Sequence, residues 1–353
     1  MKSYAKKQLI SWTAPLIAGL GLHRFFEAAY AGMGHILTFH RVVPASNQKR
    51  IHNHLSLEIS PAQLEATILF YQKKGYHFAS LDEWYQCLQQ GSVPKKMVAF
   101  TFDDGYKDNY TIAHPILKKH RVPFAIYVAT HFPDRKAILW WYLLEDMLRE
   151  RPVVSFEYQG QVHEFDCDTQ RKKENAFDQI RSLINQSFRG GATTELLKNI
   201  LQASEEELYE KGRALTMSWK EINQLSKDPL CTIGAHTVHH YPLIHLSDEQ
   251  LIKEVDTSRQ IIAQQIGKAV EHFAYPFGKA AEASHREFAL VKSLGFKTAT
   301  TTRMGNIFYE HKDKLECLPR ISINRVTDER VLQLQTSGLL PCLVHRGKRV
   351  ITH

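Results

Sequence analysis

Two groups of polar residues in this chain have the types and spacing of a hydrolytic site. The first is Asp103-Asp104, two adjacent carboxylates between the apolar residues 97–102 and Gly105. Neighbouring carboxylates repel each other, so a nearby cation stabilises the ionised pair. The second is the segment HTVHH at residues 236–240, whose first and last histidines share one face if the segment turns helically. A polar helix-capping turn remains the alternative for the first group, and a structural role for the second.

A histidine pair at this spacing is a common arrangement of metal ligands. Zinc proteases of the HExxH type need a glutamate after the first histidine, and Thr237 at that position disfavours them. The third ligand must come from another segment, and Asp104 is the obvious donor because it ends a neighbouring predicted strand. Two histidines and one carboxylate leave one position open for water, as hydrolytic metal sites require. We expect one divalent ion, in the first place Zn²⁺, although Co²⁺, Ni²⁺ and Mn²⁺ suit the same ligands.

The elements that must position these residues alternate between strand and helix. Residues 97–102 and 36–40 are apolar runs typical of strands buried on both faces, and their ends carry Asp103 and His40. Helices with N-terminal serine caps follow, for example at residues 60–63 with proline at the first helical position. Such alternation indicates an α/β fold with a parallel sheet or barrel. In a barrel, the carboxyl ends of the strands meet at one rim.

Residues 134–217 interrupt the alternation with charged, helix-rich sequence, which we interpret as a helical insertion. Trp140 and Trp141 lie near its start. Aromatic faces can stack on substrate sugar rings, but packing of the insertion on the barrel is the favoured interpretation, because aromatic side chains dominate cores. We predict an N-terminal helix at residues 1–31 and a barrel in two parts, 32–133 and 218–327, separated by the insertion at 134–217. A C-terminal helix with a basic tail follows at 328–353.

Composition limits the range of partners. The 353-residue chain has 45 Lys and Arg against 37 Asp and Glu, a mild excess that suits contact with anionic lipid or glycan. We find no aromatic-basic signature of a nucleic-acid module, so no nucleic acid partner is expected. The five cysteines are widely spaced without a CxxC pair, which indicates buried thiols in a reducing compartment.

The N-terminal segment, residues 1–31, leaves two interpretations open. Three lysines precede an apolar stretch at residues 9–22, which at 14 residues is too short to span a bilayer. The segment is either a signal peptide cleaved near residues 29–31 or a retained, basic amphipathic helix that touches a membrane surface. Polar residues between the apolar stretch and the cleavage motif favour the retained helix. We therefore expect a cytoplasmic protein, with peripheral contact to the inner membrane face, rather than a periplasmic one.

Three motifs occur in a characteristic order, each at a predicted strand end: TFDDG at residues 101–105, HTVHH at 236–240 and FAYPFG at 273–278. With them the chain resembles the polysaccharide deacetylases, the family-4 carbohydrate esterases that include nodulation-type chitooligosaccharide deacetylases. The resemblance covers about residues 36–323, apart from the insertion. It implies a distorted (β/α) barrel of about seven parallel strands. It also implies metal-dependent hydrolysis of N-acetyl groups on glycans that contain N-acetylglucosamine.

The resemblance also implies a role for each matching residue. The metal ligands are Asp104, His236 and His240. Asp103 is the general base, which takes a proton from a metal-held water as that water attacks the acetamide carbon. A backbone N–H from the segment Tyr275-Pro276-Phe277 stabilises the resulting oxyanion.

Two departures from the family pattern concern the base and the acid. Many members carry an arginine that tethers the base where this chain has Ala274, and Arg320 is our candidate substitute, with a surface ion pair as the alternative. The usual acid motif, Leu-x-His, matches only residues 343–345, in the basic tail. We predict instead that His40 is the acid, as in the poly-N-acetylglucosamine deacetylase branch, because His345 lies in a terminus of the kind that is often loosely ordered.

Two functions of other classes remain open from the sequence. One is a catalytically silent barrel that binds glycans, which the paired aspartates disfavour because a binding module needs no base beside a metal. The other is a membrane-associated scaffold that acts through the N-terminal helix and the insertion.

Overall fold

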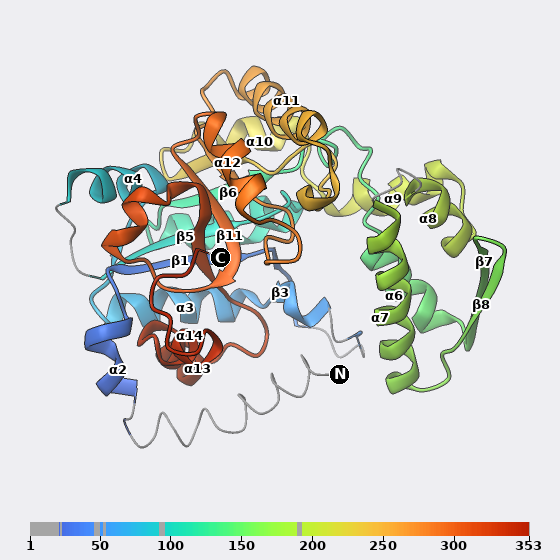
Figure 1. The fold of residues 1–353 in the computed structure, drawn as a ribbon, viewed down its shortest axis with the longest axis horizontal. Helices are drawn as coiled ribbons and strands as arrows, with labels where there is room; N and C mark the ends of the chain where they lie inside the picture. The colour runs from blue at the N-terminus through green and yellow to red at the C-terminus, as the bar shows by residue number, and fades with distance from the viewer. Residues whose placement is uncertain are drawn as a thin grey trace.

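The computed structural model describes residues 21, 23–45, 50–51, 54–91, 96–188 and 193–352. Its centre is a closed barrel of seven parallel strands, ordered β1-β12-β11-β10-β9-β6-β5, in which β5 pairs back with β1 (Figure 1). A short strand, β4 (His77–Phe78), pairs beside the start of β5. The barrel strands are β1 (Gly34–Phe39), β5 (Met97–Phe102), β6 (Phe124–Val128), β9 (Cys231–Ala235), β10 (His272–Ala274), β11 (Thr298–Met304) and β12 (Leu318–Ser322). The predicted barrel is therefore confirmed.

Strands β1 and β5 illustrate why apolar runs form this barrel. Every residue of both strands is buried, because one face packs inside the barrel and the other lies under the surrounding helices. Their register pairs Phe39 with Phe102, and the rings of these residues stack at 5.0 Å. His40 and Asp103, the next residues of the two strands, therefore leave the barrel side by side.

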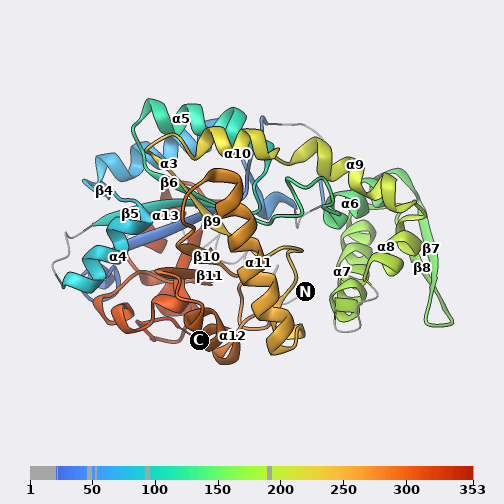
Figure 2. The same ribbon diagram turned by 90° about the horizontal axis from the view of Figure 1, so that it is seen from above.

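Helices surround the strands, as Figure 2 shows from above. They are α3 (Pro61–Lys73), α4 (Leu81–Gln90), α5 (His114–Lys119), α10 (Trp219–Leu225), α11 (Asp248–Ile266) and α12 (His285–Ser293). The predicted capping box at Ser60 is confirmed, and Ser218 and Ser247 form capping boxes at the starts of α10 and α11. A π-helical turn, η2 (Asn109–Ala113), directly precedes α5, whose second residue is Pro115.

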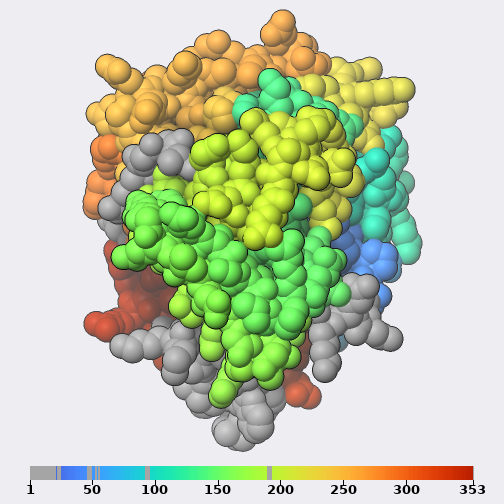
Figure 3. Space-filling view, turned by 90° about the vertical axis from the view of Figure 1, so that its right-hand side faces the viewer, coloured from blue at the N-terminus to red at the C-terminus, as the bar shows by residue number. Residues whose placement is uncertain are grey.

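The insertion forms a lobe beside the barrel with an apolar core of its own, and Figure 3 shows it covering much of one face of the molecule. Its elements are α6 (Trp140–Glu150), β7 (Val153–Tyr158), β8 (Gln161–Asp166), α7 (Gln170–Ser187), α8 (Thr193–Leu201) and α9 (Glu205–Leu215). Besides its helices, the insertion contains an antiparallel hairpin of β7 and β8 that the sequence pattern did not predict. Gln159 and Gly160 connect them with φ values of 53° and 74°, as a type I′ turn requires.

The C-terminal segment is packed rather than loose, so the expectation of a loosely ordered terminus is wrong. Helices α13 (Glu329–Thr336) and α14 (Leu339–Val344) cover the barrel together with α2 (His23–Tyr30). Ile351, near the end of the chain, is fully buried. Helix α2 covers the end of the predicted N-terminal helix at residues 1–31, most of which, residues 1–20 and 22, lies outside the described residues. Among the described helices, none is both long and apolar enough to cross a membrane.

Two buried histidines make the stability of the fold sensitive to acid. Burial lowers the pKa of His35 to about 3 and that of His54 to about 4. Both side chains protonate near pH 6.5 once the chain unfolds, so the unfolded state binds more protons and stability is lost as the pH falls from about 6.5 towards 4.

We expect each of these histidines to lower the free energy of unfolding by about 2 kcal/mol between pH 7 and pH 5. Urea unfolding at the two pH values measures the loss. His35→Gln should show a smaller loss than the unaltered protein, and equal losses in the two proteins would contradict the assignment.

Candidate metal and catalytic site

The carboxyl ends of the barrel strands β5 and β9 bring the predicted metal ligands together. Asp104 follows β5, and its Oδ1 lies 3.4 Å from His236 Nε2 and 3.2 Å from His240 Nε2. A tetrahedral zinc ion with bonds of about 2.0–2.1 Å holds its ligand atoms about 3.3 Å apart, which matches both distances. Among the described residues, these three side chains form the one cluster of this kind that could hold a metal ion.

The donor set itself fits a divalent cation. Asp104 Oδ1 is buried and has no hydrogen-bond partner among the described residues. His236 Nδ1 lies 2.7 Å from the carbonyl oxygen of Ala274, which can only accept, so Nδ1 carries the proton and Nε2 keeps its lone pair. Burial raises the pKa of Asp104, but the electrostatic influence of the adjacent His240 and His236 outweighs it and holds that pKa well below its usual range. An ionised carboxylate with two imidazole lone pairs is a suitable ligand set for zinc.

Asp103 is tied to Arg320 inside the barrel. The guanidinium of Arg320 donates from Nη1 to Asp103 Oδ1 and from Nη2 to Oδ2, both at 2.7 Å. Arg320 is fully buried and also donates to the Thr301 carbonyl and the Thr101 hydroxyl, so the alternative of a surface ion pair is wrong. Burial raises the pKa of Asp103, but the charge and hydrogen bonds of Arg320 hold it below its usual range. Asp103 is therefore ionised, as a general base must be.

The backbone around the site is unusually strained. Asp104, Thr237, His240 and Phe277 all have positive φ, between 60° and 76°. Left-handed conformations are rare for residues other than glycine and cluster at functional sites. The motif spacing alone did not predict this feature, because it depends on contacts from other parts of the chain.

His40 leaves β1 beside this cluster. Asn109 Nδ2 donates to the His40 carbonyl oxygen at 2.7 Å, which fixes the backbone where the strand ends. Burial lowers the pKa of His40, while the charges of Asp104 and Asp103 act in the opposite direction. His345, by contrast, follows α14, and its Nε2 lies 2.8 Å from the Met304 carbonyl oxygen. The structure thus brings His40, and not His345, to the two aspartates.

Of the three residues in the segment predicted to stabilise the oxyanion, one can supply a backbone N–H donor. Tyr275 donates its backbone N–H to the Thr300 carbonyl at 3.1 Å, and its buried ring points to the Glu316 carbonyl. Pro276 has no N–H, so Phe277 is the residue of the predicted segment that is left to supply the donor. Phe277 lies beside the histidine pair, with its ring centroid 4.9 Å from that of His240.

The two tryptophans of the insertion have different surroundings. Trp140 is buried in the core of the insertion and stacks on Phe177, so it has a packing role and offers no face to a sugar ring. Trp141 lies at the site: its ring centroid is 5.9 Å from that of His240, and its Nε1 donates to the Tyr106 hydroxyl at 3.2 Å. Trp141 therefore remains the candidate for contact with a sugar ring.

Arg41 is a site neighbour that the motifs did not predict. Its Nε donates to Asp108 at 2.7 Å, and its guanidinium lies 5.2 Å from the ring centroids of both Tyr106 and Tyr142. Tyr142 belongs to the insertion, so Arg41 joins the barrel rim to that lobe. A cation directly after His40, at a predicted strand end, was the signal in the sequence that could have identified it.

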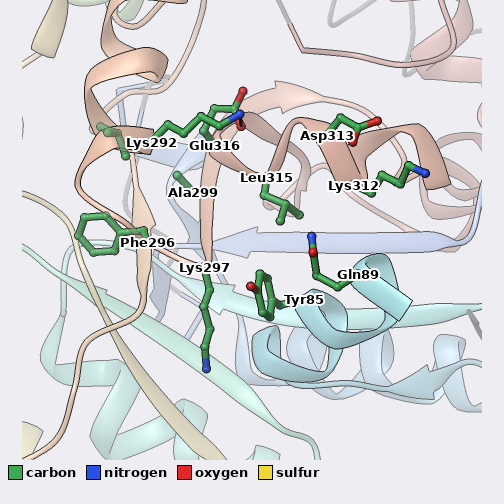
Figure 4. Close-up of a pocket in the computed structure, with 11 residues that line it drawn as sticks. Tyr85, Gln89, Lys292, Phe296, Lys297, Ala299, Lys312, Asp313, Leu315 and Glu316 are labelled. Atoms are coloured by element: carbon green, nitrogen blue, oxygen red, sulfur yellow. Dashed lines mark ion pairs between the residues drawn. The ribbon is translucent and has the colours of Figure 1, made fainter. Parts of the chain in front are cut away.

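A cavity of about 440 Å³ lies elsewhere, at the amino ends of the strands (Figure 4). It is lined by α4, by the segment joining α12 to β11, and by the turns before β12. Lys292 and Lys297 at this cavity pair with Glu316 at 3.5 Å and Asp82 at 2.7 Å. None of the predicted site residues lines it, so we assign it no part in the site.

Comparison with known families gives a match to the family model described as polysaccharide deacetylase, at residues 90–187 and 192–299. The matched residues include both aspartates and the histidine pair, whereas His40 and Arg320 lie outside them. A putative polysaccharide deacetylase of Bacillus subtilis is 27% identical over 168 residues, which are 44% of this chain and 58% of the relative. A poly-β-1,6-N-acetyl-D-glucosamine N-deacetylase of Staphylococcus aureus is 31% identical over 104 residues, 27% of this chain and 35% of the relative. The chain thus spans little more than half, or about a third, of these curated relatives.

Two solved structures share the fold. A Streptococcus pyogenes deacetylase, PplD, in complex with acetate matches with a TM-score of 0.56 at 20% identity, over 86% of this chain and 97% of its own. IcaB from Ammonifex degensii matches with a TM-score of 0.53 at 18% identity, over 87% of this chain and 97% of its own. At these identities the likeness establishes the barrel architecture alone.

Proposed function

Because the chain belongs to the polysaccharide deacetylase family, we propose that it is a metal-dependent hydrolase that removes N-acetyl groups from a glycan containing N-acetylglucosamine. The observation that carries this proposal is the cluster of Asp104, His236 and His240, with its ligand atoms within 4.8 Å of one another. Asp103 and its partner Arg320 supply a fixed, ionised carboxylate beside that cluster. A barrel that only binds glycan needs no such base.

Each residue of the site has a defined part in the reaction. A divalent cation held by the Asp-His-His cluster would polarise the acetamide carbonyl and acidify a water molecule. Asp103 accepts a proton from that water as its oxygen bonds to the acetamide carbon. The Phe277 N–H donates to the oxygen that becomes negative. His40 then gives a proton to the departing nitrogen as the C–N bond breaks, so the products are acetate and a glycan amine.

The substrate we propose is a poly- or oligosaccharide of β-1,6-linked N-acetylglucosamine. The Staphylococcus aureus relative carries that activity in its name. The resemblance to that branch implies an acid from the first strand, and His40 directly follows β1. Trp141, at the site and partly exposed, offers a face on which a sugar ring can stack. Chitooligosaccharides, with β-1,4 linkages, are the second candidate.

An acetate-release screen of the metal-loaded protein over β-1,6 and β-1,4 oligomers tests the proposal. We expect acetate from the β-1,6 series and less from the β-1,4 series. Binding of these glycans without any acetate release would overturn the proposal in favour of a silent glycan-binding barrel.

Alanine at any one of Asp104, His236 or His240 is expected to lower metal affinity and acetate release together. The loss should be at least about 10–100-fold, since that range is typical even for groups one step removed from a metal. Metal analysis after dialysis, with acetate release on the same samples, measures both. His77→Ala, an exposed histidine beside the amino end of β5, is the matched control. Full metal occupancy in all three variants would exclude these residues as ligands.

A further inference from the structure

The loop that carries the two metal-ligating histidines, residues 236–240, is held from both sides. On one side, the backbone N–H groups of Thr130 and His131 donate to the carbonyl oxygens of Thr237 at 3.1 Å and Val238 at 3.0 Å. On the other side lies a single side chain, the carboxylate of Glu254 from α11.

Glu254 uses both carboxylate oxygens on this loop. Its Oε2 accepts the backbone N–H of Val238 at 3.1 Å and that of His239 at 3.0 Å. Its Oε1 is in hydrogen-bond contact with His239 Nδ1. The Glu254 side chain is only 12% exposed, whereas that of its partner His239 is 36% exposed, so the carboxylate is largely buried while the imidazole reaches solvent.

The loop needs such a partner because its conformation is costly. Thr237 and His240 have φ values of 68° and 61°, in the left-handed region. A positive φ is especially unfavourable for a β-branched residue such as threonine, and strained residues persist only where their surroundings over-determine them. Glu254 binds the two N–H groups that lie between these strained residues. It is therefore placed to maintain the turn that brings His240 Nε2 back to Asp104.

Helix α11 provides a rigid base for this contact. Leu251 and Val255 of the same helix are fully buried against the barrel. Glu254 lies three residues after Leu251, at the flank of that buried face, so its carboxylate is directed at the loop by a packed helix.

We propose that Glu254 is a positioning residue for the metal site, which holds the 236–240 loop so that both histidines converge on Asp104. This inference rests on the proposed function only in so far as the cluster binds a metal. Glu254 itself touches neither the cluster nor the reacting atoms, and it acts through the loop backbone.

Chelator competition with Zn²⁺ on Glu254→Ala and Glu254→Gln tests the inference. Glu254→Ala should lower Zn²⁺ affinity by about tenfold or more, the range seen when an outer-shell partner is lost. Glu254→Gln should retain most of the affinity, because an amide oxygen still accepts both N–H groups and its NH₂ can donate to His239. Glu249→Ala, an exposed glutamate on the same helix, is the control and should bind like the unaltered protein. Affinity in Glu254→Ala equal to that of the control would overturn the inference.

Hydrogen exchange in the metal-free proteins separates this inference from the proposed function. Peptides covering residues 236–240 should exchange faster in Glu254→Ala than in the unaltered protein, while peptides of the insertion stay unchanged. Unaltered protein that binds no Zn²⁺ would overturn the proposed metal site, and faster loop exchange in the variant would still support positioning by Glu254. Unchanged loop exchange would overturn the positioning itself.

Discussion

Asp103→Asn is expected to lower the turnover rate by about 10²–10⁴-fold, while the variant still binds metal. The amide is close in shape to the carboxylate, but it cannot accept the proton of the attacking water. Metal affinity should persist because the three predicted ligands are other residues, and Asp103 contacts Arg320 instead. Acetate release together with metal analysis on the same preparation measures the two effects separately.

The same substitution also disturbs a buried ion pair, so the experiment needs a matched control. An amide opposite Arg320 offers one acceptor where the carboxylate offered two, and breaking a buried pair typically costs about 3–5 kcal/mol of stability. Asp108→Asn provides the control, because Asp108 is likewise the buried carboxylate partner of an arginine, Arg41. It should lose stability without a comparable loss of turnover. Turnover of Asp103→Asn within a few fold of the unaltered protein would show that Asp103 is not the base.

The barrel and the centre of the site were predictable because they depend on local sequence. A buried parallel strand reads as an apolar run, and β5 begins and ends at the residues predicted for it. Parallel strands then bring their carboxyl ends together, which places Asp104 near the histidine pair without any knowledge of individual contacts.

The directions in which the side chains of the site point could not be predicted from the sequence. Trp140 and Trp141 are neighbours on α6, where successive side chains point about 100° apart, so one enters the core of the insertion and the other reaches the site. Arg320 similarly depends on which face of β12 points into the barrel, and a shift of one residue would have put it outside. The contact of Glu254 with the histidine loop joins segments that no local pattern connects.

The hairpin in the insertion and the packed C-terminus were missed for a related reason. Strands β7 and β8 lie at the edge of a lobe, and most of their outward side chains are polar or charged. The segment therefore lacks the apolar run that predicts a buried strand. The tail carries many basic residues, yet Ile351 and Thr352 are buried against the barrel. A few tertiary contacts therefore order a segment whose composition alone is typical of a mobile end.

His40→Ala is expected to remove most turnover while leaving the affinity for metal unchanged. Expulsion of an amine needs a proton donor, and loss of a general acid typically costs about 10²–10⁴-fold in rate. The loss should fall on kcat more than on KM, because the proton is transferred as the bond breaks and not when the substrate binds. Initial rates of acetate release over a range of oligomer concentrations separate the two constants.

The contrasting variant is His345→Ala, and the structure changes how that comparison must be made. Helix α14 and the residues after it are packed on the barrel. Deleting the tail would therefore expose Arg303 and disturb much more of the structure than the surroundings of His345. A point substitution removes only the imidazole beside the Met304 carbonyl, at a cost of about 1 kcal/mol for one hydrogen bond. His345→Ala should therefore stay folded and active. An inactive but folded His345→Ala, together with an active His40→Ala, would return the acid to the tail and contradict the role of the first strand as its source.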